Sequence, residues 1–113
     1  MPHIHFVELP VQNLKAAKTF YETVFGWTMT DFGPDYACTM TGTVDLGLQG
    51  DKSEAPAAPL PVVIVTDLEA AHAAVSQAGG TITKLTFSFP GGRRFHFRDP
   101  NGMELAIMQA DQG

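Results

Sequence analysis

The strongest constraint on the fold of this chain is an internal repeat. Residues Val11–Ala17 match residues Val65–Ala71, 54 positions further along, and Gly26 and Gly80 keep the same offset. Each copy reads as an apolar strand, an Asn or Asp, an amphipathic stretch and a glycine. A repeat of this length indicates two copies of one supersecondary unit, because one copy alone cannot bury its apolar face.

Cap residues mark the ends of a helix in each copy. Asn13 and Asp67 are typical N-cap residues, whose side-chain oxygens accept a backbone N–H of the first turn. Gly26 and Gly80 suit the left-handed position that ends a helix. Apolar residues recur at helical spacing between these caps. They are Leu14, Ala17, Tyr21, Val24 and Phe25 in the first copy, and Leu68, Ala71, Val75 and Ala78 in the second.

Three short strand-like runs follow each helix, separated by turn residues. The runs are Trp27–Phe32, Tyr36–Met40 and Val44–Gln49, then Thr81–Thr86, Arg93–Arg98 and Met103–Met108. Because Gly42 matches Gly102 at an offset of 60, the second copy carries extra residues, which we place in a loop around Ser88–Gly92. We therefore expect a single domain over residues 1–113, with unit one at about 3–50 and unit two at about 60–110. A stiff, extended Pro/Ala linker at about 53–59 would join them.

Composition narrows the class of protein. With 44% hydrophobic and 17% charged residues the chain is globular rather than disordered. Its net charge of -5, without a concentrated basic surface, argues against nucleic-acid binding. No apolar run reaches the length of a membrane span, and no leader peptide is recognisable. The single Cys38 forms no internal disulfide, so we expect a cytoplasmic protein.

Three phrases carry a resemblance to a known family. Glu8–Val11, Phe20–Trp27 and Arg98–Gly102, in this order and spacing, resemble the vicinal-oxygen-chelate superfamily of glyoxalases, bleomycin-resistance proteins and dioxygenases. The resemblance covers nearly the whole chain. It implies an α+β fold of two tandem βαβββ units that form a half-open, cupped mixed sheet with helices on the outer face. Members include metal-dependent lyases, isomerases and ring-cleaving dioxygenases as well as metal-free drug-binding proteins, so the fold alone leaves the function open.

The metal site of the superfamily has no counterpart here. Metal-dependent relatives place a ligand, typically His or Glu, on the first and last strand of each unit. Counting from the helix caps and the last turns, the corresponding positions are Phe6, Leu60, Leu46 and Ala106. None of these side chains offers a lone pair to a divalent cation. A shift of one residue would bring in His5, but strand alternation places His5 on the apolar face under the helix. We expect no metal and no cofactor.

The concave face of the cup should instead be mostly apolar. Strand alternation predicts a wall for a small organic ligand, in which Phe6 and Met108 contact a flat ring. The expected ligand-binding residues are Phe6, Leu46, Leu48, Val62, Ile64, Ala106 and Met108. Glu8 and Glu104 are the two carboxylates expected there, and an apolar surrounding would raise their pKa and suit them to acid–base chemistry. Alternatively, both lie at a wet rim and have no catalytic role.

One strand leaves its orientation open. Arg94, His96 and Arg98 alternate with Phe95 and Phe97. If the polar set faces the cup, it forms an anion-binding wall. The irregular segment before this strand prevents a choice between the two orientations.

Three functions fit these features. The first is a metal-free protein that binds a small apolar or aromatic molecule, as in the bleomycin-resistance branch. The second is a lyase or isomerase of the glyoxalase type that uses Glu8 or Glu104 for proton transfer. The third is a non-catalytic module whose cup is a dimer interface. Homodimerisation is expected in each case, because half-open sheets leave unpaired edges and apolar surface. Whether the protein is an enzyme is left open.

Overall fold

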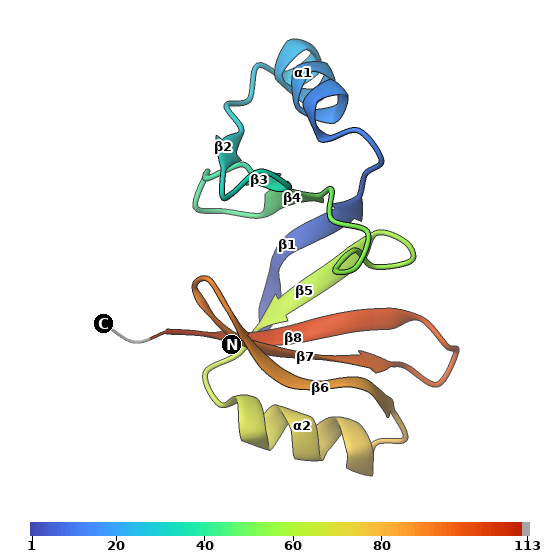
Figure 1. Cartoon of the computed structure of the whole chain (residues 1–113). Coiled ribbons are helices and arrows are strands. Elements are labelled where there is room, and N and C mark those ends of the chain that lie inside the picture. Colours follow the sequence, from blue (N-terminus) through green and yellow to red (C-terminus); the bar gives the residue numbers. More distant parts are fainter. Residues whose placement is uncertain (112–113) are drawn as a thin grey trace. The chain divides into compact units, whose positions relative to one another are not determined.

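The computed structural model describes residues 1–111 as two compact units (Figure 1). The N-terminal unit is His5–Leu60, and the C-terminal unit runs from Pro61 onward and includes Met1–Ile4. The elements of the first copy are β1 (His3–Pro10), α1 (Leu14–Phe25), β2 (Thr30–Asp31), β3 (Tyr36–Cys38) and β4 (Asp45–Gln49). Those of the second copy are β5 (Leu60–Ile64), α2 (Leu68–Gln77), β6 (Thr81–Phe89), β7 (Gly92–Arg98) and β8 (Glu104–Ala110).

Both copies have the same strand topology. The order is β2-β3-β4-β1 in the first and β6-β7-β8-β5 in the second. In each copy the first and last strands are parallel, β1 with β4 and β5 with β8, whereas the strands between them pair antiparallel. The predicted α+β fold of two tandem βαβββ units is therefore confirmed. Each helix begins the long connection that a parallel strand pair requires, and the two antiparallel strands of its copy complete that connection.

The predicted helix starts are confirmed in atomic detail. The side chain of Asn13 accepts the N–H of Ala16 at 2.9 Å, and that of Asp67 accepts the N–H of Ala70 at 3.0 Å. Gly26 ends α1 in the left-handed region, with φ of 70°. At the end of α2 the left-handed residue is Gly79, with φ of 96°, and not Gly80 as predicted.

The core of the N-terminal unit lies between α1 and its sheet. Met29, Ala37 and Leu48 are buried there, and Leu14 and Tyr21 pack against them. The predicted apolar stripe of α1 extends further than this contact: Val24 is 52% exposed and Phe25 is 55% exposed. The end of α1 therefore presents apolar side chains to solvent instead of packing them against the sheet.

The core of the C-terminal unit lies under α2, which covers one face of β6, β7 and β8 (Figure 1). Leu68, Phe95 and Ile107 are buried there, and Val63 and Phe97 pack against them. We call the opposite face of each sheet, away from its own helix, the inner face.

The extra residues of the second copy form strand and not a loop. β6 continues to Phe89 and β7 begins at Gly92, so the turn is reduced to Pro90 and Gly91. The run Thr86–Phe89 alternates polar and aromatic residues, which favours a strand. Gly91, with φ of 106°, supplies the conformation that this tight turn requires. The linker also differs from the extended segment expected, because Glu54 and Ala55 both donate a backbone N–H to the carbonyl of Asp51 and form a turn.

Among the described residues, no helix is long and apolar enough to cross a membrane.

The two N-caps predict equal effects on stability. Asn13→Ala and Asp67→Ala each remove one side-chain acceptor at a helix start, so each should lower the free energy of unfolding by about 1 kcal/mol. Urea denaturation followed by circular dichroism measures this. Asn13→Asp and Asp67→Asn keep an acceptor and serve as controls that should stay close to the wild type. A loss in the controls as large as in the alanine variants would contradict a capping role.

Candidate functional site

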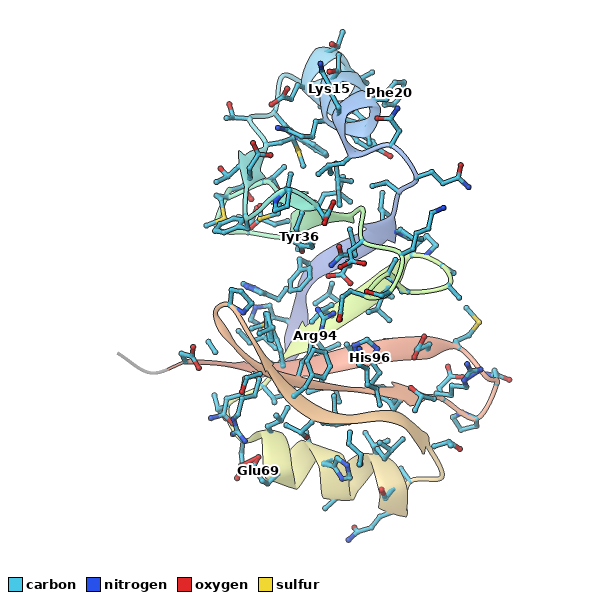
Figure 2. All side chains as sticks on the ribbon, viewed as in Figure 1. Lys15, Phe20, Tyr36, Glu69, Arg94 and His96 are labelled. Atoms are coloured by element: carbon cyan, nitrogen blue, oxygen red, sulfur yellow. The ribbon has the colours of Figure 1, made fainter. Side chains whose placement is uncertain are left out.

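The orientation of β7 determines which side chains face away from α2. Phe95 is completely buried in the core under α2, so strand alternation turns Arg94 and His96 to the inner face. Figure 2 shows Arg94 and His96 on one side of the sheet, and α2 with Glu69 on the other side. Arg94 is 7% exposed and His96 is 6% exposed. The orientation that the sequence left open is thus settled in favour of an inward-facing polar set.

Strand β6 adds two aromatic rings and a second cation to this surface. The Cζ atom of Arg94 lies 5.3 Å from the ring centre of Phe87 and 5.2 Å from that of Phe89. The ammonium of Lys84 lies 4.4 Å from the ring centre of Phe87. All three distances fall in the range of cation–π attraction. We call this set, together with His96 and Glu104, the β6–β8 polar cluster.

Two irregularities in β6 bring these residues to one face. The pairing with β7 shifts between Ile82 and Lys84 and again between Lys84 and Phe87. In a regular strand, residues three apart point to opposite faces. The extra residue of a β-bulge restores them to the same face. This is why Lys84 and Phe87 contact each other although their spacing in the sequence is odd.

Glu104 and His96 form a close carboxylate–imidazole pair. Nδ1 of His96 lies 3.6 Å from Oε2 of Glu104, and the hydroxyl of Thr83 donates a hydrogen bond of 2.9 Å to the same oxygen. The separation is too long for a well-formed hydrogen bond but short enough for electrostatic attraction. The carboxylate favours the tautomer that carries its proton on Nδ1.

The other ring nitrogen of His96 is buried without a partner. Among residues 1–111, Nε2 of His96 has no hydrogen bond and almost no exposed surface. Burial and the charge of Arg94 lower the pKa of His96 from 6.5 to about 4, against the opposing effect of Glu104. At neutral pH the ring is therefore neutral, and Nε2 presents a lone pair on the inner face.

Four of the residues expected on the apolar wall lie on the inner face of the C-terminal unit. Val62 pairs with Ala106 and Ile64 with Met108 across β5 and β8, on the face opposite Ile107. Val62, Ala106 and Met108 are all at most 4% exposed. Their expected role in ligand binding remains a prediction.

Two expected wall residues of the first copy lie on the other face. Leu46 and Leu48 pack into the core under α1, because Leu48 pairs with Leu9 on the helix side of the sheet. The inner face of β4 therefore carries its odd-numbered residues, including Asp45 and Gly47, which pair with Phe6 and Glu8. The expected position of Leu46 and Leu48 is wrong because the turn between Gly42 and β4 is one residue longer than the matching turn after Gly102. The expected inward position of Phe6 and Glu8 agrees with this pairing.

The two candidate carboxylates lie in different units. Glu8 is 2% exposed in the N-terminal unit, whereas the side chain of Glu104 in the C-terminal unit is 27% exposed. Glu104 belongs to the β6–β8 polar cluster, where it lies beside His96 and accepts a hydrogen bond from Thr83. The catalytic role of either carboxylate stays a prediction.

His72 and Cys38 lie outside the β6–β8 polar cluster. His72 is half-buried on α2, with its ring 4.8 Å from that of Phe95. Burial raises the pKa of the Cys38 thiol, as does the nearby charge of Asp45. Such a thiol is mainly protonated at neutral pH and is a weak nucleophile.

A hollow of the C-terminal unit lies away from the residues of the β6–β8 polar cluster. It has a volume of about 590 Å³ and is bounded by Ile64, Asp67 and Gln109, among others. Two of its polar groups already have partners within the fold: the carboxylate of Asp67 caps α2, and Oε1 of Gln109 accepts the N–H of Leu68 at 2.8 Å. We therefore take the β6–β8 polar cluster as the candidate site.

Comparison with known proteins identifies the family. The profile of the Glyoxalase/Bleomycin resistance protein/Dioxygenase superfamily matches residues 3–107. The chain belongs to this superfamily. No curated protein matches the sequence significantly.

Solved structures show the same fold at low identity. A structure described as an NAD-dependent benzaldehyde dehydrogenase from Legionella pneumophila has a TM-score of 0.76 at 19% identity, covering 94% of this chain and 98% of the other. Methylmalonyl-CoA epimerase from Mycobacterium tuberculosis has a TM-score of 0.75 at 15% identity, covering 96% and 88%. The Mn(II)-bound glyoxalase from Novosphingobium aromaticivorans has a TM-score of 0.67 at 19% identity, covering 97% of this chain and 41% of the other. At these identities the likeness shows the fold alone.

The donor set does not fit the metal site that some members of the superfamily contain. The pairing of Glu8 with Gly47 in β1 and β4 corresponds to that of Val62 with Ala106 in β5 and β8. The last-strand position of the first copy is therefore Gly47 and not Leu46. Glycine, like Phe6, Leu60 and Ala106, has no side-chain donor. Within residues 1–111, no three His, Cys, Asp or Glu side chains come together in a group able to hold a metal ion.

The lowered pKa of His96 predicts a specific dependence of stability on pH. Above pH 6.5 the ring is neutral in both the folded and the unfolded chain, so it adds no pH dependence. Between pH 6.5 and 4 the unfolded chain takes up a proton that the folded chain does not. His96 should therefore lower the free energy of unfolding by up to about 3 kcal/mol as the pH falls through this range.

Urea denaturation at pH 7 and at pH 4.5 measures this loss. The carboxylates contribute to the same experiment, so the quantity to compare is the difference between the wild type and His96→Phe. The variant should lose less stability on acidification. Identical losses in both proteins would show that His96 titrates normally.

Proposed function

We propose that this protein binds a small planar organic acid on the inner face of the C-terminal unit, without a metal. The observation that carries the proposal is the position of Arg94, a nearly buried guanidinium flanked by the rings of Phe87 and Phe89. A guanidinium recognises a carboxylate through two parallel N–H donors, and its planar shape holds the acid in a defined orientation.

The residues around Arg94 favour an acid whose remaining part is flat and apolar. Val62, Ala106 and Met108 provide an apolar wall, and Met108 pairs directly with Arg94 across β7 and β8. The rings of Phe87 and Phe89 can stack on a conjugated system, and the methionine sulfur makes favourable contacts with aromatic rings. Lys84 adds a second positive charge beside Phe87. An aromatic or conjugated carboxylate combines the two properties that this surface recognises.

Paired acids and amides test the proposal directly. Benzoate and 1-naphthoate should bind to the wild-type protein in calorimetric titrations, whereas benzamide and 1-naphthamide should bind much more weakly because they lack the charge. Arg94→Met should weaken acid binding by about tenfold or more, since a charged hydrogen bond contributes about 1.5–3 kcal/mol.

Arg93→Met is the matched control. Arg93 is the neighbour of Arg94 in β7, but it forms an ion pair of 3.3 Å with Glu69 of α2 on the other side of the sheet. Its removal should leave acid binding as it is. Equal affinities for acids and amides, or an equal loss in both arginine variants, would contradict a role of Arg94 in recognising the acid.

Elemental analysis tests whether the protein binds its ligand without a metal. Protein purified without chelators should contain less than one equivalent of Mn, Fe, Ni or Zn by elemental analysis, because the family ligand positions carry no donor atoms. Addition of EDTA should leave benzoate binding unchanged. A stoichiometric metal that is required for binding would overturn this part of the proposal.

A second candidate function is proton transfer, as in lyases and isomerases of the glyoxalase type. It is favoured by the contact of His96 with Glu104, because a carboxylate–imidazole pair is a common acid–base arrangement. In this function Glu104, or Glu8 in the other unit, would move the proton. Loss of turnover with retained binding in Glu104→Gln or Glu8→Gln would distinguish an enzyme from a binding protein.

We also propose that the protein forms a homodimer. β2 ends the strand order of one copy and β6 ends that of the other, and strands with one unpaired edge favour association. A purely structural role of the inner face as a dimer interface would leave it no space for a small acid. Sedimentation velocity with and without benzoate separates a ligand-binding dimer from this third function.

A further inference from the structure

We infer that the acid bound at the β6–β8 polar cluster carries a hydroxyl group, which donates a hydrogen bond to Nε2 of His96. This inference rests on the proposed function and narrows its ligand class from aromatic acids to hydroxylated aromatic acids. The observation behind it is the buried Nε2 atom, which has no hydrogen bond among residues 1–111. Buried polar atoms in proteins nearly always have a partner, so a partner supplied by a ligand explains this one.

The chemistry of the ring decides what that partner must be. Because Glu104 lies beside Nδ1, the proton of the neutral ring is held on that side and Nε2 is an acceptor. An acceptor excludes carboxylate oxygens and ether oxygens as partners and selects an O–H or N–H donor. Thr83 donates to the same oxygen of Glu104 and keeps the carboxylate in place. Glu104 and Thr83 therefore act as positioning residues for His96.

The positions of Arg94 and His96 indicate that the ligand has a polar group at each of its two ends. The two residues are second neighbours on β7 and face the same side, which separates them by about 7 Å along the strand. Arg94 is placed to bind the acidic group, and His96 is placed to accept from a group further along the molecule. Phe87, which lies 5.7 Å from the His96 ring and 5.3 Å from Cζ of Arg94, provides an aromatic surface between them. A hydroxybenzoate is the simplest molecule with an acid, a ring and a hydroxyl in this order.

Benzoate and its three monohydroxy isomers are the probes. At least one hydroxy isomer should bind to the wild type about tenfold more tightly than benzoate, since pairing a buried acceptor is worth about 1–3 kcal/mol. In His96→Phe the ratio of the two affinities should fall to about one. His72→Phe, which alters a histidine on the α2 side of the same sheet, should leave both affinities as they are.

Glu104→Gln separates positioning from packing. Without the negative charge, the proton of His96 should shift toward Nε2, which nitrogen-15 spectra of the histidine rings detect, and the preference for the hydroxy acid should shrink. A merely structural role of Glu104 would leave the ring tautomer unchanged. The preference should also stay constant from pH 8 to pH 5.5, because a ring with a pKa of about 4 remains neutral there although Arg94, Lys84 and Glu104 surround it.

The outcomes are distinguishable from one another. If benzoate binds but no hydroxy isomer binds more tightly, or if the preference survives in His96→Phe, the inference is wrong and the proposed function stands. If neither benzoate nor any hydroxy isomer binds, both are wrong. Should His96→Phe fail to fold, the nitrogen-15 signal of Nε2 in the wild type tests the inference instead. A hydrogen bond from the ligand hydroxyl to Nε2 should shift this signal when the hydroxy acid binds, whereas benzoate should not shift it. Equal shifts with both ligands would contradict the hydrogen bond.

Discussion

The burial of Phe95 under α2 is the contact on which the candidate site depends. This side chain is completely inaccessible and packs with Leu68 and Ile107. A β-strand has a period of two, so a shift by one residue would exchange every side chain between the two faces. Anchoring one aromatic ring in the core therefore holds Arg94 and His96 on the other side. The stability of the helix–sheet core and the chemistry of the inner face are two consequences of one packing contact.

The sequence predicted the architecture well because the repeat carries strong local signals. The caps at Asn13 and Asp67 form the hydrogen bonds that their residue types favour, and the alternation of β1 and β5 has the expected orientation. These features depend on neighbours close in the chain. An N-cap needs only the next turn, and a strand with one apolar face reveals its orientation by composition.

The site was harder to predict because its features depend on pairing between strands. The predicted face of Leu46 and Leu48 is wrong, since one residue more or less in the preceding turn reverses the orientation of a strand. The bulges of β6 similarly conceal that Lys84 and Phe87 share a face. The role of His96 arises from three strands, with Thr83 on β6 and Glu104 on β8. A signal existed in the alternation of Arg94, His96 and Arg98 with two phenylalanines, but it left the orientation undecided.

The irregular pairing of β6 has a consequence for how such a protein diversifies. In a regular hairpin, deletion of one residue slides the rest of the strand and exchanges its two faces. Because β6 already absorbs extra residues at two places, a gain or loss of one residue there rotates only the segment up to the next irregularity. A change of one residue can thus turn Lys84 alone, or Phe87 together with Phe89, away from the inner face. The register between β7 and β8 stays the same. Changes in chain length, as much as replacement of side chains, offer a way to evolve a different binding preference on the same scaffold.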